Sequence, residues 1–206
     1  RTAAVSLQEN NAIAILDIAE ARVRRIVGLG FKDHRLPKNA LDANKEDDKA
    51  VIKPQPLFGM YQPDTIAAFE IDGRTLLLSA NEGDARDYPG FSEESDVEDA
   101  RLDKAWRGKT GEFGGLTITT TLGDTDGDGD LDELYCFGAR SFSIWDGEDG
   151  HLLYDSGDEL ERRTAGEYPM NFNADNDEND IDSRSDNKGP EPEAATVGVI
   201  DGRTYA

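Results

Sequence analysis

Residues 3–28 read AAVSLQENNAIAILDIAEARVRRIVG and decide the fold class of this chain. Apolar and β-branched residues alternate in this stretch, which predicts three short strands over Ala3–Leu7, Ala12–Ile18 and Arg22–Val27. The asparagine pair at 10–11 marks the first turn, because asparagine tolerates the left-handed backbone that tight turns need. Three strands at this close spacing are typical of one blade of a β-propeller.

A second stretch of sequence occurs twice. Pro63–Thr75 (PDTIAAFEIDGRT) aligns without gaps with Pro192–Thr204 (PEAATVGVIDGRT). Such self-similarity indicates repeated supersecondary units, and the shared Asp-Gly pair predicts a hairpin turn between two strands. A carboxylate, Asp64 or Glu193, follows the proline in each copy. We expect these two side chains either to cap a strand or to line a central channel.

Together these patterns predict an all-β fold, a single partial β-propeller over 1–206 of the YVTN/WD40-like type, with about three blades, the start of another and long acidic loops. Blade-like units are expected at about 1–30, 57–90, 112–160 and 190–206, with long polar loops at 31–56, 91–111 and 161–189. Because a blade buries its faces against its neighbours, we expect the chain to be part of a larger propeller. Residues 95–107 predict one short amphipathic helix that turns Val97, Leu102 and Trp106 toward the core.

The loop Asp124–Asp132 (DTDGDGDLD) has the spacing of a calcium-binding loop. Ca²⁺ takes six to eight oxygen ligands, and alternate residues of a tight loop can supply them. We expect side-chain oxygens from Asp124, Asp126, Asp128 and Asp132, and the backbone carbonyl of Asp130, around a sharp turn at Gly129. Mg²⁺ or another divalent cation is also compatible with these ligands. The alternative is a solvated acidic turn without metal, in which the aspartates would repel one another strongly.

This loop differs from an EF-hand in one ligand and in its flanks. An EF-hand needs a bidentate glutamate at position 12, where this chain has Tyr135. The flanking segments, Leu116–Leu122 and Leu134–Phe137, are strand-like. The loop therefore resembles the D-x-D-x-D-G-x-x-D loops on the blades of integrin α-subunit propellers.

Composition limits the partners of the protein. The 44 acidic and 22 basic residues give a formal net charge of −22, which excludes nucleic acid and anionic membrane as electrostatic partners and favours divalent cations. A salt-loving host would produce the same acidity. The single cysteine, Cys136, stands in an apolar strand and is expected to be a buried small hydrophobe. No stretch approaches the roughly 20 apolar residues of a membrane span, so we expect no membrane insertion in this segment.

Segments from nearly the whole chain carry a resemblance to a known family; they are Leu7–Asn11, Gly30–His34, Gly59–Asp64, Ala80–Arg86, Gly123–Glu133, Phe137–Trp145, Asp182–Asp186 and Lys188–Glu193. They resemble the choice-of-anchor I family. The resemblance implies a secreted or surface-anchored bacterial protein with a YVTN/WD40-like propeller, extracellular, at the cell surface or periplasmic. The family is similar to the mesenchyme-specific cell-surface glycoprotein of echinoderm skeleton-forming cells, and some members are described as alkaline phosphatases.

Two functions are compatible with these features. The first is an extracellular calcium-binding propeller for adhesion, surface attachment or mineral and ion handling, whose partners are divalent cations and cell-surface or extracellular matrix components. The second is a metal-dependent phosphoesterase that acts on phosphate esters at the propeller mouth. Its candidate catalytic residues are Asp64, Glu82, Asp84, Arg86, Arg140 and Arg184. A second metal or channel site would involve Asp87, Asp182, Glu191 and Glu193.

The phosphoesterase interpretation depends on the arginines, because a guanidinium suits bidentate contact with phosphate. For each of them the alternative is an ion pair that holds a loop to its acidic neighbours. His34 and His151 are the two histidines of the chain, and a zinc phosphatase would need more nitrogen ligands. The calcium-binding interpretation is therefore the preferred one.

Overall fold

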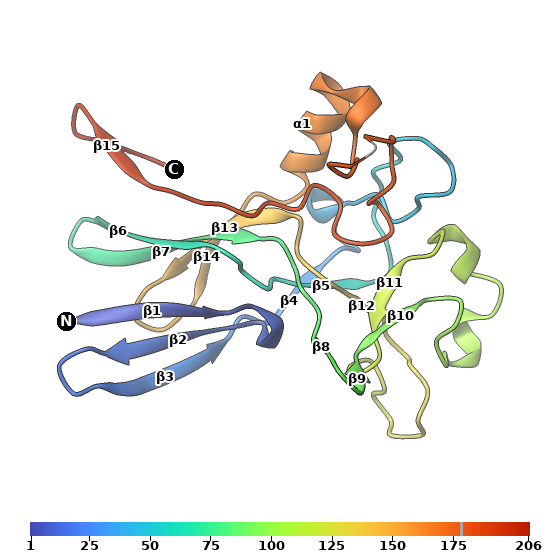
Figure 1. Cartoon of the computed structure of the whole chain (residues 1–206), viewed down its shortest axis with the longest axis horizontal. Coiled ribbons are helices and arrows are strands. Elements are labelled where there is room, and N and C mark those ends of the chain that lie inside the picture. Colours follow the sequence, from blue (N-terminus) through green and yellow to red (C-terminus); the bar gives the residue numbers. More distant parts are fainter. Residues whose placement is uncertain (178) are drawn as a thin grey trace.

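The computed structural model describes residues 1–177 and 179–206, and most of its regular structure is β-sheet (Figure 1). A three-stranded antiparallel sheet contains β1 (Thr2–Leu7), β2 (Ala12–Asp17) and β3 (Arg22–Gly28) in that order. A four-stranded antiparallel sheet has the order β14–β13–β7–β6 and contains β6 (Ile66–Ile71), β7 (Arg74–Asn81), β13 (Ser141–Asp146) and β14 (Leu152–Asp155). A separate hairpin contains β15 (Gly198–Ile200) and β16 (Arg203–Tyr205).

A second group of strands lies at the end of the molecule away from both termini (Figure 1). Its five-stranded sheet has the order β10–β11–β12–β5–β4, formed by β4 (Phe31–Asp33), β5 (Phe58–Met60), β10 (Glu94–Asp96), β11 (Thr117–Thr119) and β12 (Tyr135–Cys136). The pair β5–β12 is parallel and the others are antiparallel. A small hairpin contains β8 (Asp87–Tyr88) and β9 (Phe91–Ser92).

Helical structure is scarce. The described residues contain one α-helix, α1 (Glu159–Glu167), and five short 3₁₀ turns. The turns are η1 (Gln8–Asn10), η2 (Pro37–Asn39), η3 (Lys104–Trp106), η4 (Thr110–Glu112) and η5 (Pro169–Asn171). In the part of the chain that the structure describes, no helix combines the length and the hydropathy needed to cross a membrane.

The local predictions for the strands and turns are confirmed. The three strands expected in residues 3–28 form the sheet β1–β2–β3, and Asn11 adopts a left-handed backbone with φ of 48° in its first turn. Both copies of the repeat form hairpins, β6–β7 and β15–β16. In each copy the Asp-Gly pair has positive φ at both residues, 51° and 76° at 72–73 and 49° and 75° at 201–202, as a type I′ turn requires.

The all-β class is confirmed, but a propeller is not. The four-stranded antiparallel sheet takes β6, β7, β13 and β14 in chain order, as a propeller blade takes its strands. Residues 82–140 intervene between β7 and β13, so strands of the expected units at 57–90 and 112–160 are shared between two sheets. The described sheets do not close into a ring.

The helix expected over 95–107 is wrong. Ser95 pairs with Ile118 in the ladder between β10 and β11, and only the short turn η3 follows. Strand pairing with a distant segment therefore overrides the local apolar spacing. The expected packing is nevertheless confirmed, since Val97, Leu102 and Trp106 all contact the core.

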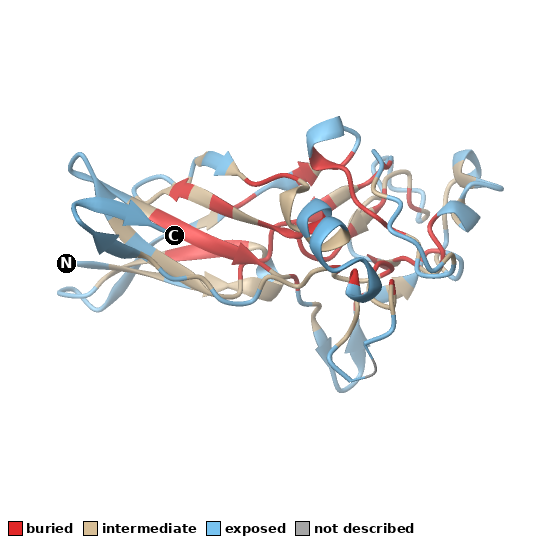
Figure 2. Ribbon diagram, turned by 90° about the horizontal axis from the view of Figure 1, so that it is seen from above, coloured by how far each residue is buried: buried red, intermediate tan, exposed pale blue. Residues whose placement is uncertain are grey.

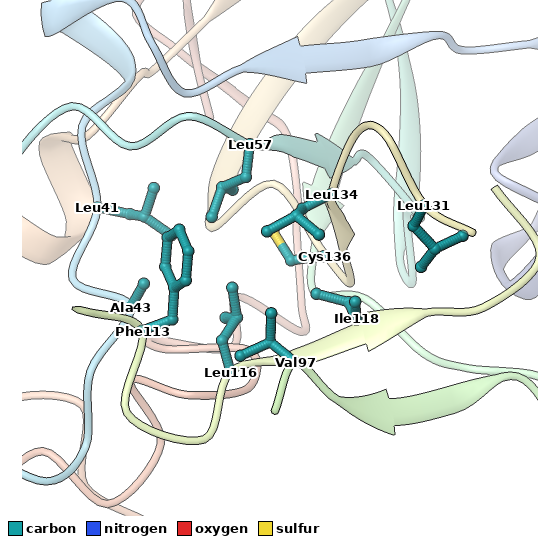
Figure 3. Packing of buried hydrophobic residues seen from close by; sticks show 10 residues of the cluster. All are labelled: Leu41, Ala43, Leu57, Val97, Phe113, Leu116, Ile118, Leu131, Leu134 and Cys136. Atoms are coloured by element: carbon teal, nitrogen blue, oxygen red, sulfur yellow. The ribbon is translucent and has the colours of Figure 1, made fainter. Parts of the chain in front are cut away.

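Two apolar cores hold the two groups of strands. The first lies under the five-stranded sheet and its loops, and Figure 3 shows its side chains converging: Leu41, Ala43, Leu57, Val97, Phe113, Leu116, Ile118, Leu131, Leu134 and Cys136. The second lies between the other sheets: Ile13, Leu29, Tyr61, Leu77, Ala139 and Trp145. Burial of each large side chain contributes about 1.5–3 kcal/mol. Cys136 is buried as expected, and burial raises the pKa of its thiol to about 11.

The two groups meet beyond the end of β7, where the buried residues Gly83 and Gly138 cross. Figure 2 shows buried segments through the middle of the molecule. A Cβ on Gly83 would lie 2.2 Å from the backbone nitrogen of Gly138. The fully buried Gln62 ties this crossing together, because its Oε1 accepts from Gly138 N at 3.0 Å and its Nε2 donates to the Asp84 carbonyl at 2.7 Å. Close backbone contact, rather than apolar packing, therefore joins the sheets here.

This crossing predicts a difference between two glycines that both have positive φ. Gly83 (φ 99°) meets Gly138, whereas a Cβ on Gly90 (φ 90°) would meet nothing within 4 Å. We expect Gly83→Ala to lower the unfolding free energy by about 1–3 kcal/mol more than Gly90→Ala, because the backbone strain is similar but only Gly83 is overpacked. Urea denaturation of both variants measures this difference, and equal losses would contradict the crossing.

Candidate metal centre

The loop between β11 and β12 is closed at its base and anchored in the core. The Gly123 carbonyl accepts from Asp132 N at 2.8 Å and from Glu133 N at 3.1 Å. Gly123 has φ of 102°, and a Cβ there would lie 2.1 Å from the Glu133 carbonyl, so this position requires glycine. Leu131 and Leu134 belong to the first apolar core. The aspartates therefore stand on a fixed base.

Three of the predicted ligands gather at the exposed tip of the loop. Asp124, Asp126 and Asp128 each place one carboxylate oxygen within 4.8 Å of the other two. Their carboxylates also accept backbone N–H groups of the loop, as when Asp124 accepts from Gly127 N at 2.7 Å and from Gly129 N at 3.0 Å. These bonds turn the side chains toward the inside of the loop.

The other two predicted ligands join an aspartate from a different segment. Asp130 and Asp132 each place a carboxylate oxygen within 4.8 Å of the other and of Asp103. Asp132 Oδ2 accepts from Thr125 N at 2.8 Å and from Thr125 Oγ1 at 2.6 Å. Asp130 Oδ1 is buried and has no hydrogen-bond partner among the residues that the structure describes. The loop therefore offers two adjoining groups of carboxylates.

Asp103 was not found from the sequence because nothing near it resembles a metal loop. Its approach depends on an isolated parallel bridge between Leu102 and Leu131, in which Asp103 N donates to the Leu131 carbonyl at 3.1 Å. The indole Nε1 of Trp106 donates to the Asp132 carbonyl at 3.0 Å and fixes the same segment against the loop. The one sequence signal near Asp103 was the apolar spacing of Leu102 and Trp106. It predicted that this segment packs on the core, but not that it packs beside the aspartate loop.

The pKa values of the loop carboxylates move in opposite directions. Desolvation raises the pKa of Asp130, and the neighbouring charges of Asp128 and Asp103 raise it further. Hydrogen bonds from the hydroxyl and the backbone of Thr125 lower the pKa of Asp132. Like charges are thus crowded at Asp130, where an added cation would relieve repulsion.

Asp64 and Glu193, the two residues expected to cap a strand or line a channel, lie close together. Desolvation raises the pKa of Asp64, and the charges of Glu82, Glu193 and Asp84 raise it further. Lys188 partly neutralises this group, since its Nζ lies 2.7 Å from Glu82 Oε1. Gln8 Nε2 donates to the other oxygen of Glu82 at 2.7 Å.

The predicted second site is only partly assembled. Glu191 and Glu193 line one polar cavity together with Glu82. Asp87 lies elsewhere, in the β8–β9 hairpin. Asp182 is fully buried and accepts hydrogen bonds from Lys49 N at 3.2 Å and from the Ser185 hydroxyl, so it holds two loops together.

Comparison with known proteins agrees with the resemblance seen in the sequence. The family model described as the choice-of-anchor I domain matches residues 1–206. The chain belongs to the choice-of-anchor I family. Gigasin-3a of Magallana gigas is 39% identical over 90 residues, which cover 41% of this chain and 31% of that protein. The match thus spans about a third of the relative's length, and no solved structure gives a significant match. Family membership identifies a secreted or surface-anchored protein.

The three candidate arginines of this choice-of-anchor I domain are all paired with glutamates. Arg140 Nη1 lies 2.6 Å from Glu161 Oε1, and both side chains are almost completely buried. Arg86 and Arg184 pair with Glu93 and Glu191 respectively. These contacts correspond to the ion-pair alternative for each arginine, and they give no support to a phosphate site.

Arg140 holds several segments of the choice-of-anchor I domain together. Besides its pair with Glu161, its Nη1 donates to the Asp42 carbonyl, and its Nη2 donates to the carbonyls of Ser185 at 2.7 Å and Asn187 at 2.8 Å. Arg140 itself has a left-handed backbone with φ of 53°. Its role is therefore structural.

This role predicts that Arg140→Ala destabilises the domain. We expect a loss of about 3–5 kcal/mol in unfolding free energy, because Glu161 would be left charged and buried without its partner. Arg162→Ala is the matched control, since its pair with Asp158 lies on the surface of α1 and contributes less than about 1 kcal/mol. Guanidinium denaturation gives both values, and similar losses would contradict the structural role.

The pair of Arg86 with Glu93 is part of a denser network. Glu93 is 2% exposed and accepts from Arg86 N at 2.8 Å, Arg86 Nε at 3.2 Å and Arg86 Nη2 at 2.8 Å. It also accepts from the hydroxyls of Thr119 at 2.8 Å and Thr121 at 3.0 Å. Burial alone would raise the pKa of Glu93, but these hydrogen bonds outweigh burial and lower the pKa to about 2.

A folded-state pKa of about 2 for Glu93 makes the unfolding free energy of the domain depend on pH. The folded domain binds fewer protons than the unfolded chain between about pH 4.5 and 2, so stability is lost as the pH falls through this window. This pKa shift corresponds to about 3 kcal/mol of unfolding free energy. We expect the parent domain to lose this amount on acidification, and Glu93→Gln to lose less. The exposed Glu112 supplies the control Glu112→Gln, and a parallel pH profile for Glu93→Gln and the parent would refute the assignment.

Proposed function

We propose that this domain is a calcium-binding module of a surface-associated protein, serving adhesion, surface attachment or mineral and ion handling. The observation that carries the proposal is the gathering of Asp124, Asp126 and Asp128 at the tip of a glycine turn. Three carboxylates in this arrangement provide hard oxygen ligands, and their mutual repulsion favours a divalent cation between them.

The donor set supports Ca²⁺ over other metals. The loop offers carboxylate and carbonyl oxygens and lacks histidine and cysteine, whereas structural zinc sites are built from nitrogen and sulfur. Mg²⁺ demands a compact octahedron, and Ca²⁺ accepts irregular geometry with more ligands. An exposed loop tip with several carboxylates fits the larger ion better.

Asp103 would supply a ligand to the second group of carboxylates, beside the loop tip. In an EF-hand the last carboxylate comes from position 12, which is Tyr135 in this chain. Asp103 brings a carboxylate from a neighbouring segment to Asp130 and Asp132 instead. A cation bound there would join the segment around η3 to the loop, so that binding would stabilise more than the loop alone.

The localisation of the protein outside the cytoplasm or at the surface agrees with a calcium site of low affinity. A secreted or surface-anchored protein meets calcium at concentrations where extracellular modules with dissociation constants of about 10⁻⁴–10⁻³ M are loaded. Adhesion and mineral handling both need a cation that is held and shared at the surface, and the net charge of −22 attracts such cations to the whole domain. The partners proposed are divalent cations and acidic surface or matrix components that a bound cation can bridge.

The proposal predicts that calcium raises the melting temperature through this loop. At about 100 times the dissociation constant, binding adds about 2.7 kcal/mol, or a rise of about 5–10 °C for a domain of this size. We expect Asp126→Asn to lose this rise while melting like the parent in chelator, because the amide oxygen can still accept from Asp128 N. Asp103→Asn should lose part of it. Differential scanning calorimetry with and without calcium measures the effect.

The control for this experiment is Asp149→Asn. Asp149 lies in the turn between β13 and β14, where its Oδ1 accepts from His151 N at 2.8 Å. This variant should keep the full response to calcium. A response that persists in Asp126→Asn, or that is absent from the parent domain, would refute calcium binding at the loop.

A further inference from the structure

A cleft with a volume of about 410 Å³ lies between the end of the first sheet and residues that flank the β8–β9 hairpin or follow β11. One side is formed by the turn η1 and the connection from β3 to β4, and the other by Arg86, Glu93 and residues 121–122. Figure 1 shows the loop that leads to β8 beside the turn at the end of β1, and Tyr88 of β8 donates to Glu9 of this turn. The wall is mainly apolar and includes Leu29, Phe31, Met60 and Leu122. Phe31 packs edge-on against Tyr135 and is still 45% exposed, so part of its ring is accessible in this wall.

Arg86 presents unused donors at this cleft. Its Nε and Nη2 are engaged by Glu93 and Thr121, and its Nη1 has no hydrogen bond among the residues that the structure describes. A guanidinium carries five N–H groups, so the two on Nη1 remain available. The five hydrogen bonds to Glu93 fix the orientation of Arg86, and its side chain is still 34% exposed. A side chain that is both fixed and accessible is suited to position a ligand.

Acceptors face the same cleft from the opposite side. Glu9 accepts from the Tyr88 hydroxyl through Oε2, which fixes its carboxylate and leaves Oε1 for another partner. The exposed Asn10 adds an amide with both donors and an acceptor. The cleft thus combines an aromatic and aliphatic wall with separate donors and acceptors.

We infer that this cleft binds a neutral saccharide unit. A hydroxyl group both donates and accepts, so a ring that carries several hydroxyls can satisfy Arg86 Nη1 and Glu9 Oε1 together. The apolar C–H face of such a ring would pack on Phe31 and Met60. A purely apolar ligand would remove water from Arg86 and Glu9, and it could not replace the hydrogen bonds that this water makes to them.

The charge balance favours a neutral ligand over an acidic one. The charge of Arg86 is already balanced by Glu93, and Glu9 adds a negative charge to the cleft. The domain as a whole carries −22, which repels anions. This inference is independent of the calcium loop, because none of the loop aspartates lines the cleft.

Saturation-transfer NMR and calorimetry on the whole domain test the inference. The probes are methyl β-glucoside, diacetylchitobiose and mannobiose as neutral sugars, glucuronate as an acidic sugar, and trialanine as a peptide. We expect at least one neutral sugar to bind, with affinity reduced about tenfold or more in Phe31→Ala and in Arg86→Gln. Phe31→Ala keeps the test valid if Arg86→Gln fails to fold, because the Phe31 side chain is 45% exposed and carries no buried charge.

Arg35→Gln is the matched control. Arg35 is 55% exposed, pairs with Asp33 and lies over the ring of Phe58, outside the cleft. It should bind sugar like the parent. Three results would overturn the inference: no binding of any neutral sugar at about 10 mM, a range that detects even millimolar dissociation constants; equal binding by the parent and Phe31→Ala; or preferential binding of glucuronate or trialanine.

Discussion

The buried ion pair between Arg140 and Glu161 is the interaction on which much of the loop structure depends. It joins the segment before β13 to α1, and Nη1 and Nη2 of Arg140 also donate to the carbonyls of Asp42, Ser185 and Asn187, while its buried Nε has no hydrogen-bond partner among the described residues. These segments do not share a β-sheet with one another, so no backbone ladder could replace these contacts. Burial of two charges and a left-handed arginine both cost free energy, and such a centre is stable only when every partner is in place. The loops around it therefore form as one unit.

Packing within each group of strands and contact between the two groups depend on different interactions. Each has its own apolar core, but the crossing between them is made by the Gly83–Gly138 contact and by Gln62. Figure 2 shows buried residues continuing through this middle region, while the hairpin tips are exposed. Backbone contacts of this kind fix geometry more strictly than apolar packing does, because they allow little adjustment. The relative position of the Asp124–Asp132 loop and the β6–β7 sheet follows from this constraint.

The sequence was informative where structure is local and silent where it is not. The strands of residues 3–28, the two Asp-Gly hairpins and the inward-turned aspartates at 124–128 all follow from alternation and turn chemistry within a few residues. The pairing of β7 with β13 crosses residues 82–140, and the approach of Asp103 to the loop depends on a single bridge, so neither leaves a local pattern. The helix α1 was missed for another reason: Glu161 is its one buried residue, so it has no apolar stripe to recognise.

The acidity of the chain has a physical consequence for the proposed function. The carboxylates are not spread evenly: Asp124, Asp126 and Asp128 gather at one loop tip, and Asp103, Asp130 and Asp132 beside it, while Glu93 and Glu161 are neutralised by arginines in the interior. These two buried glutamates are thus neutralised without a metal, whereas six aspartates gather at a surface loop whose base is fixed by Leu131 and Leu134. A cation at that loop would not be needed to form the core. It would instead reduce the repulsion between the aspartates and order this exposed loop. If calcium has this effect, the loop can respond to the calcium concentration of the medium without unfolding of the domain.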